Sequence, residues 1–420
     1  MAGADQATTA GAFSVNRRLL SRRKLLKAVA ALPLAYAAPL CAEPPPAQAI
    51  TPALIAAATK EGQLTWYTSA DSQLAEKVGK AFEQKFRGVR VRVERAGGER
   101  IFSRVAQEYA SGLHVADAVS TGDAAQFLAW KRQELLAPYV PEDVARYIPP
   151  EHRDPDGFYA SVRSSLCVIA YNTAMVKRED APKSFANLLD LKWKGKIVKA
   201  HPSYSGTIMT STYQMVRELS WSYLEQLARQ QVLQIQSATD TPKKVVLGER
   251  PVMADGNESN VLLLKEAGGS IEVVYAAEGT PSIVQPSAIF VAAPHPNAAR
   301  LFQNYLFGVE GQELFVNLGG LRSLHALVKD KPGRTPLSAI KVWKDDPAAV
   351  ETQGEEIKRR YSLWCLITRS RGSTPRLHMK QLKQVPLSVS SVHDCRYKPS
   401  AGQPLPRFDL SRSQLVSGLR

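Results

Sequence analysis

The chain has 420 residues, of which 44% are hydrophobic and 22% charged, a globular composition that excludes a collagen, a coiled coil or a wholly disordered protein. At roughly 100 to 200 residues per domain, this length predicts two domains or lobes. The formal net charge of +15 is concentrated at the ends, because residues 1–49 carry +4, residues 361–420 carry +8, and only +3 remains for residues 50–360. A nearly neutral central part argues against a nucleic-acid-binding face.

The first 49 residues have the features of an export signal peptide. A basic stretch up to Lys27 precedes an apolar run from Ala28 to Ala42, and small residues suited to cleavage follow as far as Ala49. The apolar run is shorter than the roughly 20 residues that span a bilayer, so no permanent membrane anchor is expected. Residues 21–27 (SRRKLLK) resemble a twin-arginine export motif, with a Sec signal as the alternative. We expect a periplasmic protein that is cleaved near Ala49.

Predicted helices and strands alternate from residue 51 onwards. Thr51 and Pro52 are typical of a helix start, and Gly62 of a helix end. The periodicity predicts strands at 64–67, 89–93 and 116–119, and helices at 52–61, 73–86, 101–109 and 124–136. This order predicts a parallel, doubly wound α/β sheet, which binds ligands beyond the carboxyl ends of its strands.

A second α/β unit is predicted in the following part of the chain. Residues 166–171 form an apolar strand that is expected to cross between the lobes, and Cys167 within it is expected to be a small buried side chain. The remaining predicted strands are 197–200, 252–254, 271–275 and 289–292, and the last predicted helices are 298–307, 311–318 and 347–361.

Four segments carry a resemblance to a known family. They are residues 61–69 (EGQLTWYTS), 170–173 (AYNT), 189–197 (LDLKWKGKI) and 296–302 (PNAARLF), the last leading to the Glu-Gly-Gln of 310–312. In their order and spacing, over about residues 55–360, they resemble the periplasmic solute-binding proteins of ABC importers, in the group that includes ferric-ion-binding proteins.

The resemblance implies a type II periplasmic-binding-protein fold, in which two doubly wound α/β lobes joined by a hinge close over one small ligand. The first lobe would comprise residues 50–160 plus about 276–325, and the second residues 161–275 plus about 326–360. The closed monomer would deliver its ligand to a membrane permease driven by a separate ATPase. Residues 361–420 contain ten Ser and five Pro but no Glu, and we expect a disordered tail outside the family fold, with a basic appendage as the alternative.

The ligand is expected to be a small anion, with iron as the alternative. Ferric-binding relatives carry adjacent tyrosines after a strand of the second lobe, but the matching stretch 252–260 (VMADGNESN) has none, and tyrosinate is the hard oxygen donor that suits Fe(III). Asp255 and Glu258 could still supply carboxylates, or this stretch could cap a helix. No resident cofactor is expected, and Fe(III) enters only as possible cargo.

The resemblance also places an anion site before a helix of the second lobe, where backbone N–H groups and hydroxyls favour an anion, although a plain N-cap is the alternative. Phosphate esters, phosphonates and carboxylates would all suit such a site. Loops after the first three strands and the return crossing would line the same cleft. The candidate ligand-binding residues are Thr68, Ser69, Arg95, Arg100, Thr121, Asp123, Ser203, Ser205, Gly206, Thr207, Asp255, Asn257 and Glu278.

Catalysis is not expected. The seven histidines include no closely spaced pair suited to zinc, and the chain contains no G-x-S-x-G nucleophile elbow. A binding protein is therefore predicted, and a periplasmic enzyme on the same fold is the alternative.

Overall fold

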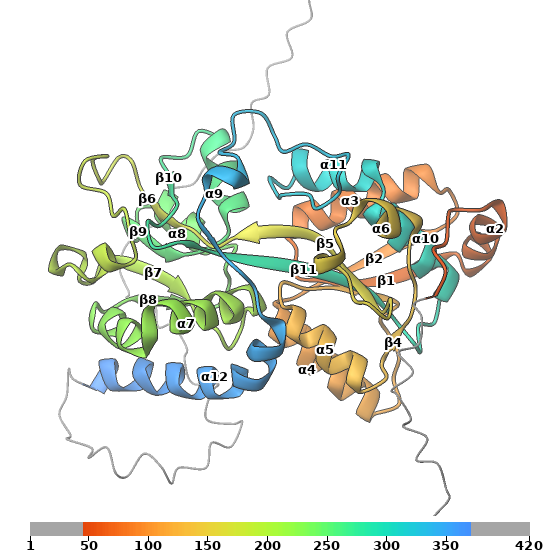
Figure 1. Cartoon of the computed structure of the whole chain (residues 1–420), viewed down its shortest axis with the longest axis horizontal. Coiled ribbons are helices and arrows are strands. Elements are labelled where there is room, and N and C mark those ends of the chain that lie inside the picture. The colour runs from red at the N-terminus through yellow and green to blue at the C-terminus, as the bar shows by residue number, and fades with distance from the viewer. Residues whose placement is uncertain (1–44, 371–420) are drawn as a thin grey trace, which may run out of the picture. The chain divides into compact units, whose positions relative to one another are not determined.

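The structure of the protein is a computed structural model that describes residues 45–370, with side chains as far as Leu363. Its strands form two separate sheets of seven and five strands, and helices pack on both, which makes two α/β lobes (Figure 1). The predicted signal sequence up to residue 44 and the predicted tail from residue 371 lie outside the described residues.

The first lobe is built on the seven-stranded sheet, in the order β12-β11-β3-β1-β2, with β4 and β5 also paired to β11. β1 runs parallel to both β2 and β3, as the βαβ order predicts. Its strands are β1 (Gln63–Thr68), β2 (Arg90–Arg95), β3 (Ala118–Ser120), β4 (Leu136–Ala137), β5 (Tyr159–Leu166), β11 (Thr280–Phe290) and β12 (Val342–Trp343). Its helices are α2 (Pro52–Glu61), α3 (Ser72–Lys85), α4 (Gly98–Ala110), α5 (Ala124–Arg132), α6 (Glu142–Tyr147), η1 (Pro150–His152), α10 (Pro296–Phe307) and α11 (Val309–Asn317).

The second lobe is built on the five-stranded sheet, in the order β10-β6-β9-β7-β8. Its strands are β6 (Ile169–Tyr171), β7 (Ile197–Ala200), β8 (Leu233–Ile235), β9 (Val252–Asp255) and β10 (Glu272–Val274). Its helices are η2 (Ala186–Leu189), η3 (Leu191–Trp193), α7 (Gly206–Arg229), α8 (Thr241–Val246) and α9 (Glu258–Glu266). A short η4 (Leu337–Ala339) and α12 (Pro347–Ser370) follow, and residues of α12 pack against both α5 and α7.

Each lobe has its own apolar core. In the first, the rings of Phe82 and Trp66 both pack edge-on against Phe302, with ring centroids 5.1 and 5.2 Å apart. In the second, Phe185 packs edge-on against Tyr223 of α7, with ring centroids 6.1 Å apart, within a separate buried cluster. Two independent cores allow the lobes to move as units about the segments that join them.

Local sequence signals account for most of the helix and strand positions. Thr51 caps α2 by accepting a hydrogen bond from the Leu54 N–H at 3.1 Å, and Gly62 ends the helix with a φ of +74°, a conformation that favours glycine. Val89 is buried and Val91 and Val93 are half-buried along β2, with arginines exposed between them. The alternation predicted for the first lobe is therefore confirmed.

Three elements differ from the prediction. β11 begins at Thr280 rather than near Ile289. The prediction missed its first part because Pro281 and Pro286 are unusual within a strand, and the strand has a bulge at Gln285/Pro286. α5 ends at Arg132, since Glu134 takes a positive φ and the chain then enters β4. The single strand predicted at 166–171 is two strands, β5 and β6, in different sheets.

β5 and β11 are the strands that connect the lobes. They lie antiparallel, from the pair Ser282 and Leu166 to the pair Ala288 and Tyr159, and run from one lobe towards the other (Figure 1). The break between β5 and β6 falls at Cys167, which is buried as predicted and forms no disulfide, and whose N–H donates to Pro281 O at 2.9 Å. These strands therefore occupy the position of a hinge and the floor of the space between the lobes.

The first and last described residues can be compared with the predicted ends of the signal peptide and of the folded part. Gln48 donates from its N–H to Val140 O at 2.9 Å, so the last residues of the predicted signal contact the first lobe. The predicted tail boundary falls inside α12, where Tyr361 is buried and hydrogen-bonded to Gln234, so this tyrosine belongs to the fold. Within residues 45–370, no helix combines the length and apolar character needed to cross a membrane.

Candidate functional site

Three parallel strands in each lobe have their carboxyl ends at one cleft between the lobes. β1, β2 and β3 end there from the first lobe, and β7, β8 and β9 from the second. The loops after all of these strands except β3 line two adjoining pockets, which share Ser69, Thr207, Thr239 and Asn257. The cleft thus lies where doubly wound sheets place their ligand sites.

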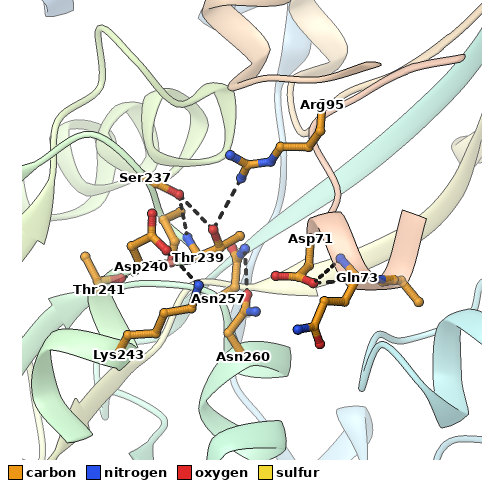
Figure 2. A network of polar contacts seen from close by, with 12 residues as sticks. Asp71, Gln73, Arg95, Ser237, Thr239, Asp240, Thr241, Lys243, Asn257 and Asn260 are labelled. Atoms are coloured by element: carbon orange, nitrogen blue, oxygen red, sulfur yellow. Dashed lines mark hydrogen bonds and ion pairs between the residues drawn. The ribbon is translucent and has the colours of Figure 1, made fainter. Parts of the chain in front are cut away.

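The first of these, here named the α7 pocket, has a volume of about 180 Å³ and lies against the N-terminus of α7. Ser205 is the N-cap residue, and its Oγ accepts the Ile208 N–H at 3.4 Å. Arg95 donates from Nη2 to Thr239 Oγ1 at 3.3 Å and from Nε to Ala70 O at 3.2 Å (Figure 2). Arg100 donates to the side-chain oxygen of Gln236.

These arginine contacts cross the cleft, and neither arginine has a carboxylate partner among the described residues, since the carboxylate that lines this pocket, Asp240, pairs with Lys243 at 2.9 Å. Arg95 and Arg100 belong to the first lobe, whereas Thr239 and Gln236 belong to the second, and both partners are neutral. Two cations facing a helix N-terminus make a site that attracts an anion.

The second pocket, here named the β5 pocket, measures about 100 Å³ and contains Arg163 of β5 and Gln285 of β11. Arg163 is fully buried, and its Nε donates to Gln285 Oε1 at 2.7 Å. Its Nη1 and Nη2 have no partner among the described residues, while the guanidinium lies 4.9 Å from the ring of Phe315. Burial lowers the pKa of Arg163 to about 10, so the side chain is still cationic at neutral pH.

Asn257 is placed between the two pockets. It occupies the N-cap position of α9 without capping it, and its Nδ2 donates instead to Asn260 Oδ1 at 3.3 Å (Figure 2). Its own Oδ1 is buried and has no hydrogen-bond partner within residues 45–363. An unpaired acceptor of this kind suits a ligand that donates a hydrogen bond.

The lobes are closed onto each other, and glycines make the contact. A Cβ on Gly97 would lie 2.4 Å from Tyr204 O, one on Gly122 would lie 2.2 Å from Thr207 Oγ1, and one on Gly206 would lie 2.6 Å from Asp123 Cβ. None of the three has a positive φ, so backbone conformation does not demand glycine there. The requirement is close approach between the lobes.

Seven of the residues predicted from the sequence line these pockets, and the structure brings them together from the carboxyl ends of four strands, β1, β2, β7 and β9, and the segments that follow them. They are Ser69, Arg95, Arg100, Ser205, Gly206, Thr207 and Asn257.

Four other predicted residues lie near the cleft but are used in local structure. Thr68 is buried and its Oγ1 accepts the Ala70 N–H at 3.2 Å. Thr121 donates to Gln126 Oε1 at 2.9 Å, and Asp123 caps α5 through the Ala125 N–H at 2.9 Å. Burial and the nearby Glu99 raise the pKa of Asp123. The Ser203 N–H donates to His201 Nδ1, and this serine lines neither pocket.

The predicted carboxylate ligands are placed elsewhere. Asp255 is fully buried and forms an ion pair with Lys199 at 2.8 Å, and burial raises its pKa despite that partner. Glu278 lies outside both pockets, where its carboxylate accepts the N–H groups of Phe185 and Ala186. Glu258 is paired with both Arg322 and Arg334. The structure therefore brings none of these three carboxylates into the cleft as a free ligand.

Sequence reasoning missed Arg163, Gln285 and Thr239. The available signal for Arg163 was a lone arginine within a run of small and apolar residues (YASVRSSL), a pattern in which a charge is rarely buried without a reason. Gln285 gave no such signal, because β11 was recognised only at its end. Within residues 45–363, no cluster of three or more His, Cys, Asp or Glu side chains suited to a metal ion is present.

A more voluminous cavity, about 710 Å³, lies away from this cleft. Its walls are mostly apolar and include Pro45 and Pro46, which belong to the predicted signal. The charged residues there are already used, because Asp154 pairs with Lys131 at 2.6 Å and Arg153 donates to Val144 O and Ala145 O. We place the ligand site in the smaller pockets, which collect unpaired polar groups from both lobes.

His201, at the base of the loop before α7, is expected to make stability depend on pH. Burial, and secondarily Lys199, lower its pKa to about 4. An unfolded histidine titrates near 6.5, so the unfolded chain binds this proton first and stability falls as the pH drops from 6.5 towards 4. We expect a loss of about 2 kcal/mol from this group between pH 7.5 and 5. Urea titrations of the wild type and His201→Asn at both pH values measure it; equal pH dependence in the two proteins would contradict the assignment.

Comparison with known proteins adds the following. Residues 116–336 match a family described as bacterial extracellular solute-binding protein. The periplasmic binding protein AfuA from Actinobacillus pleuropneumoniae, with exogenous fructose-6-phosphate bound, is 23% identical with a TM-score of 0.67, covering 73% of this chain and 99% of that one. Iron-bound HitA from Pseudomonas aeruginosa is 22% identical with a TM-score of 0.62, over 71% and 99% of the two chains.

A sequence relative of this chain is iron uptake protein A1 from Synechocystis sp. (strain ATCC 27184 / PCC 6803 / Kazusa), 25% identical over 224 residues, or 50% of this chain and 61% of the relative. Together with the two structural neighbours, the family match confirms the predicted fold of two α/β lobes of the type II periplasmic-binding-protein kind.

Proposed function

Because the chain belongs to the family of bacterial extracellular solute-binding proteins, we propose that it captures a small anionic solute between its lobes and delivers it to an ABC permease driven by a separate ATPase. Export to the periplasm, through the N-terminal signal that the sequence predicts, is part of this proposal. The protein acts in it as a monomeric binding component and not as an enzyme.

The observation that carries the proposal is the α7 pocket. Backbone N–H groups at the start of α7 face Arg95 and Arg100 from the opposite lobe, and both arginines contact only neutral partners across the cleft. An anion placed there would contact both lobes at once. It would therefore bind the closed form more tightly than the open form, which is the condition for ligand-driven closure.

Iron uptake is the alternative, since HitA is described as iron-bound and another relative as an iron uptake protein. Asp255 and Glu258 lie in the stretch that matches the tyrosines of ferric-binding relatives, and they, like Glu278, already have their own partners. Iron would have to arrive with a chelating anion that occupies most of its coordination sites, because hard cations require oxygen ligands. The anionic solute is favoured because two arginines and a helix N-terminus, which suit an anion, line the cleft.

Native mass spectrometry of the protein purified without added ligand, with an iron assay on the same sample, tests the proposal. We expect a bound, iron-free mass that carries an acid group. A bound mass containing iron would support the alternative, and a neutral compound would contradict both. An empty cleft would be followed by a thermal-shift screen, in which a ligand at about 100 times its Kd stabilises the fold by about 2.7 kcal/mol.

A further inference from the structure

Arg163 makes the β5 pocket a second cationic chamber beside the α7 pocket. The residue lies on β5 and its partner Gln285 lies on β11, so the chamber is part of the strands that connect the lobes. Rigid strand positions hold the guanidinium in place, and the ring of Phe315 packs against it at 4.9 Å.

The arginine is costly where it stands. Its side chain contacts neither water nor a counter-ion. The exposed fraction of Arg163 is 0%, and two of its nitrogens have no partner among the described residues. A buried charge without a partner destabilises a fold, and replacing it by an apolar residue of similar size is often neutral or favourable. Arg322, which is also fully buried among the described residues, differs in having Glu258 and Asp330 as ion-pair partners.

The chamber is continuous with the proposed solute site. Ser69, Thr207, Thr239 and Asn257 line both pockets, and the unpaired Oδ1 of Asn257 lies between them. The other charged residues of the β5 pocket are Asp71 and Lys77. The Asp71 carboxylate caps α3, where it accepts the Gln73 N–H at 2.9 Å, and its one negative charge is outnumbered by the positive charges of Arg163 and Lys77, so the chamber is net positive.

We propose that Arg163 binds a second acid group of the solute, so that the transported compound has an anionic group at each end and a hydrogen-bond donor between them. The inference rests on the proposed function, since the first acid group occupies the α7 pocket. The β5 pocket, at about 100 Å³, suits a carboxylate, whose two oxygens match the two free nitrogens of the guanidinium. A hydroxyl between the acid groups would donate to Asn257. Phosphorylated hydroxy acids meet this description.

Matched pairs of phosphate monoesters test this directly, because the two members of each pair differ only in a carboxylate replaced by a hydroxymethyl group. Suitable pairs are phosphoglycolate with 2-hydroxyethyl phosphate, 3-phosphoglycerate with glycerol 3-phosphate, and 6-phosphogluconate with sorbitol 6-phosphate. Isothermal titration calorimetry on the full chain, after removal of co-purified ligand, measures their affinities. We expect at least one carboxylate-bearing member to bind at least about 100-fold more tightly than its partner.

Arg163→Met separates a binding role from a structural one. This variant is expected to keep or raise the melting temperature without ligand, to lose the preference for the carboxylate, and to bind the hydroxymethyl compounds as the wild type does. Arg163→Lys keeps the positive charge but lacks the two parallel N–H groups of the guanidinium. It should therefore retain more of the preference for the carboxylate than Arg163→Met does. Arg322→Met is the matched control, and it should lower the melting temperature because it leaves Glu258 and Asp330 without that partner.

The outcomes distinguish this inference from the function on which it rests. Equal binding of both members of every pair would overturn the role of Arg163 and leave an anionic solute in place. A lower melting temperature for Arg163→Met with an unchanged carboxylate preference would also overturn it, by showing a structural arginine. Failure of every compound to bind, together with a co-purified solute that has no acid group, would overturn both proposals.

Discussion

Asp255→Asn is expected to lower the free energy of unfolding by about 3–5 kcal/mol. Asp255 and Lys199 are both completely buried, 2.8 Å apart between β9 and β7. The lysine's other contacts within the described residues are weaker: Thr212 Oγ1 and Ala200 O, both at 3.3 Å, and the ring of Tyr361, 5.2 Å from its centroid. Removal of the carboxylate charge leaves a buried ammonium group without a counter-ion, and the lost attraction is not replaced by water. Denaturant titration monitored by circular dichroism measures the change.

The double variant Lys199→Met, Asp255→Leu provides the control. It removes both charges and fills the space with apolar side chains, so its stability should return to within about 1 kcal/mol of the wild type or exceed it. The same double variant should keep the affinity for the transported solute, because Asp255 lies outside the pockets. A double variant as unstable as Asp255→Asn would contradict the ion-pair explanation. A double variant that no longer binds the solute would show that Asp255 contributes to the ligand site.

Gly97→Ala is expected to hold the lobes apart and to raise the Kd for the solute by about tenfold to a hundredfold, or about 1.4 to 2.7 kcal/mol. The new methyl group would lie 2.4 Å from the backbone oxygen of Tyr204 in the opposite lobe, and a backbone atom cannot rotate away. Gly97 has a φ of −65°, so alanine is compatible with the local backbone. Small-angle X-ray scattering should show a larger radius of gyration than for the wild type under the same conditions.

Gly354→Ala in α12 is the matched control, because a Cβ there would meet no atom within 4 Å. It should change neither the scattering profile nor the affinity, and a small rise in helix stability is the only effect expected. If Gly97→Ala binds the solute as tightly as the wild type does, the glycines of the lobe contact do not limit closure. If both variants lose affinity equally, the effect is not specific to the contact between the lobes.

The sequence was sufficient to predict the α/β architecture and to name several residues that line the candidate pockets. Helix caps at Thr51 and Gly62, and the alternation of Val89, Val91 and Val93, are local signals that act over a few residues. Strands in a βαβ order must place their following loops at one edge of a sheet, which is why Ser69, Arg95, Arg100 and Thr207 could be named before any geometry was known.

Only the tertiary structure decided which of those side chains face the cleft. Asp255 follows a strand as expected, yet it is paired with Lys199 across two strands that are distant in sequence, and no local pattern encodes that pairing. Arg163 and Gln285 come together because β5 and β11 pair over a separation of more than a hundred residues, and the register of that pairing depends on long-range packing. The burial of a side chain depends on the assembled lobes rather than on any single segment. The free-energy cost of burying a charge, and the stabilisation that a contact provides, therefore depend on the tertiary structure as well.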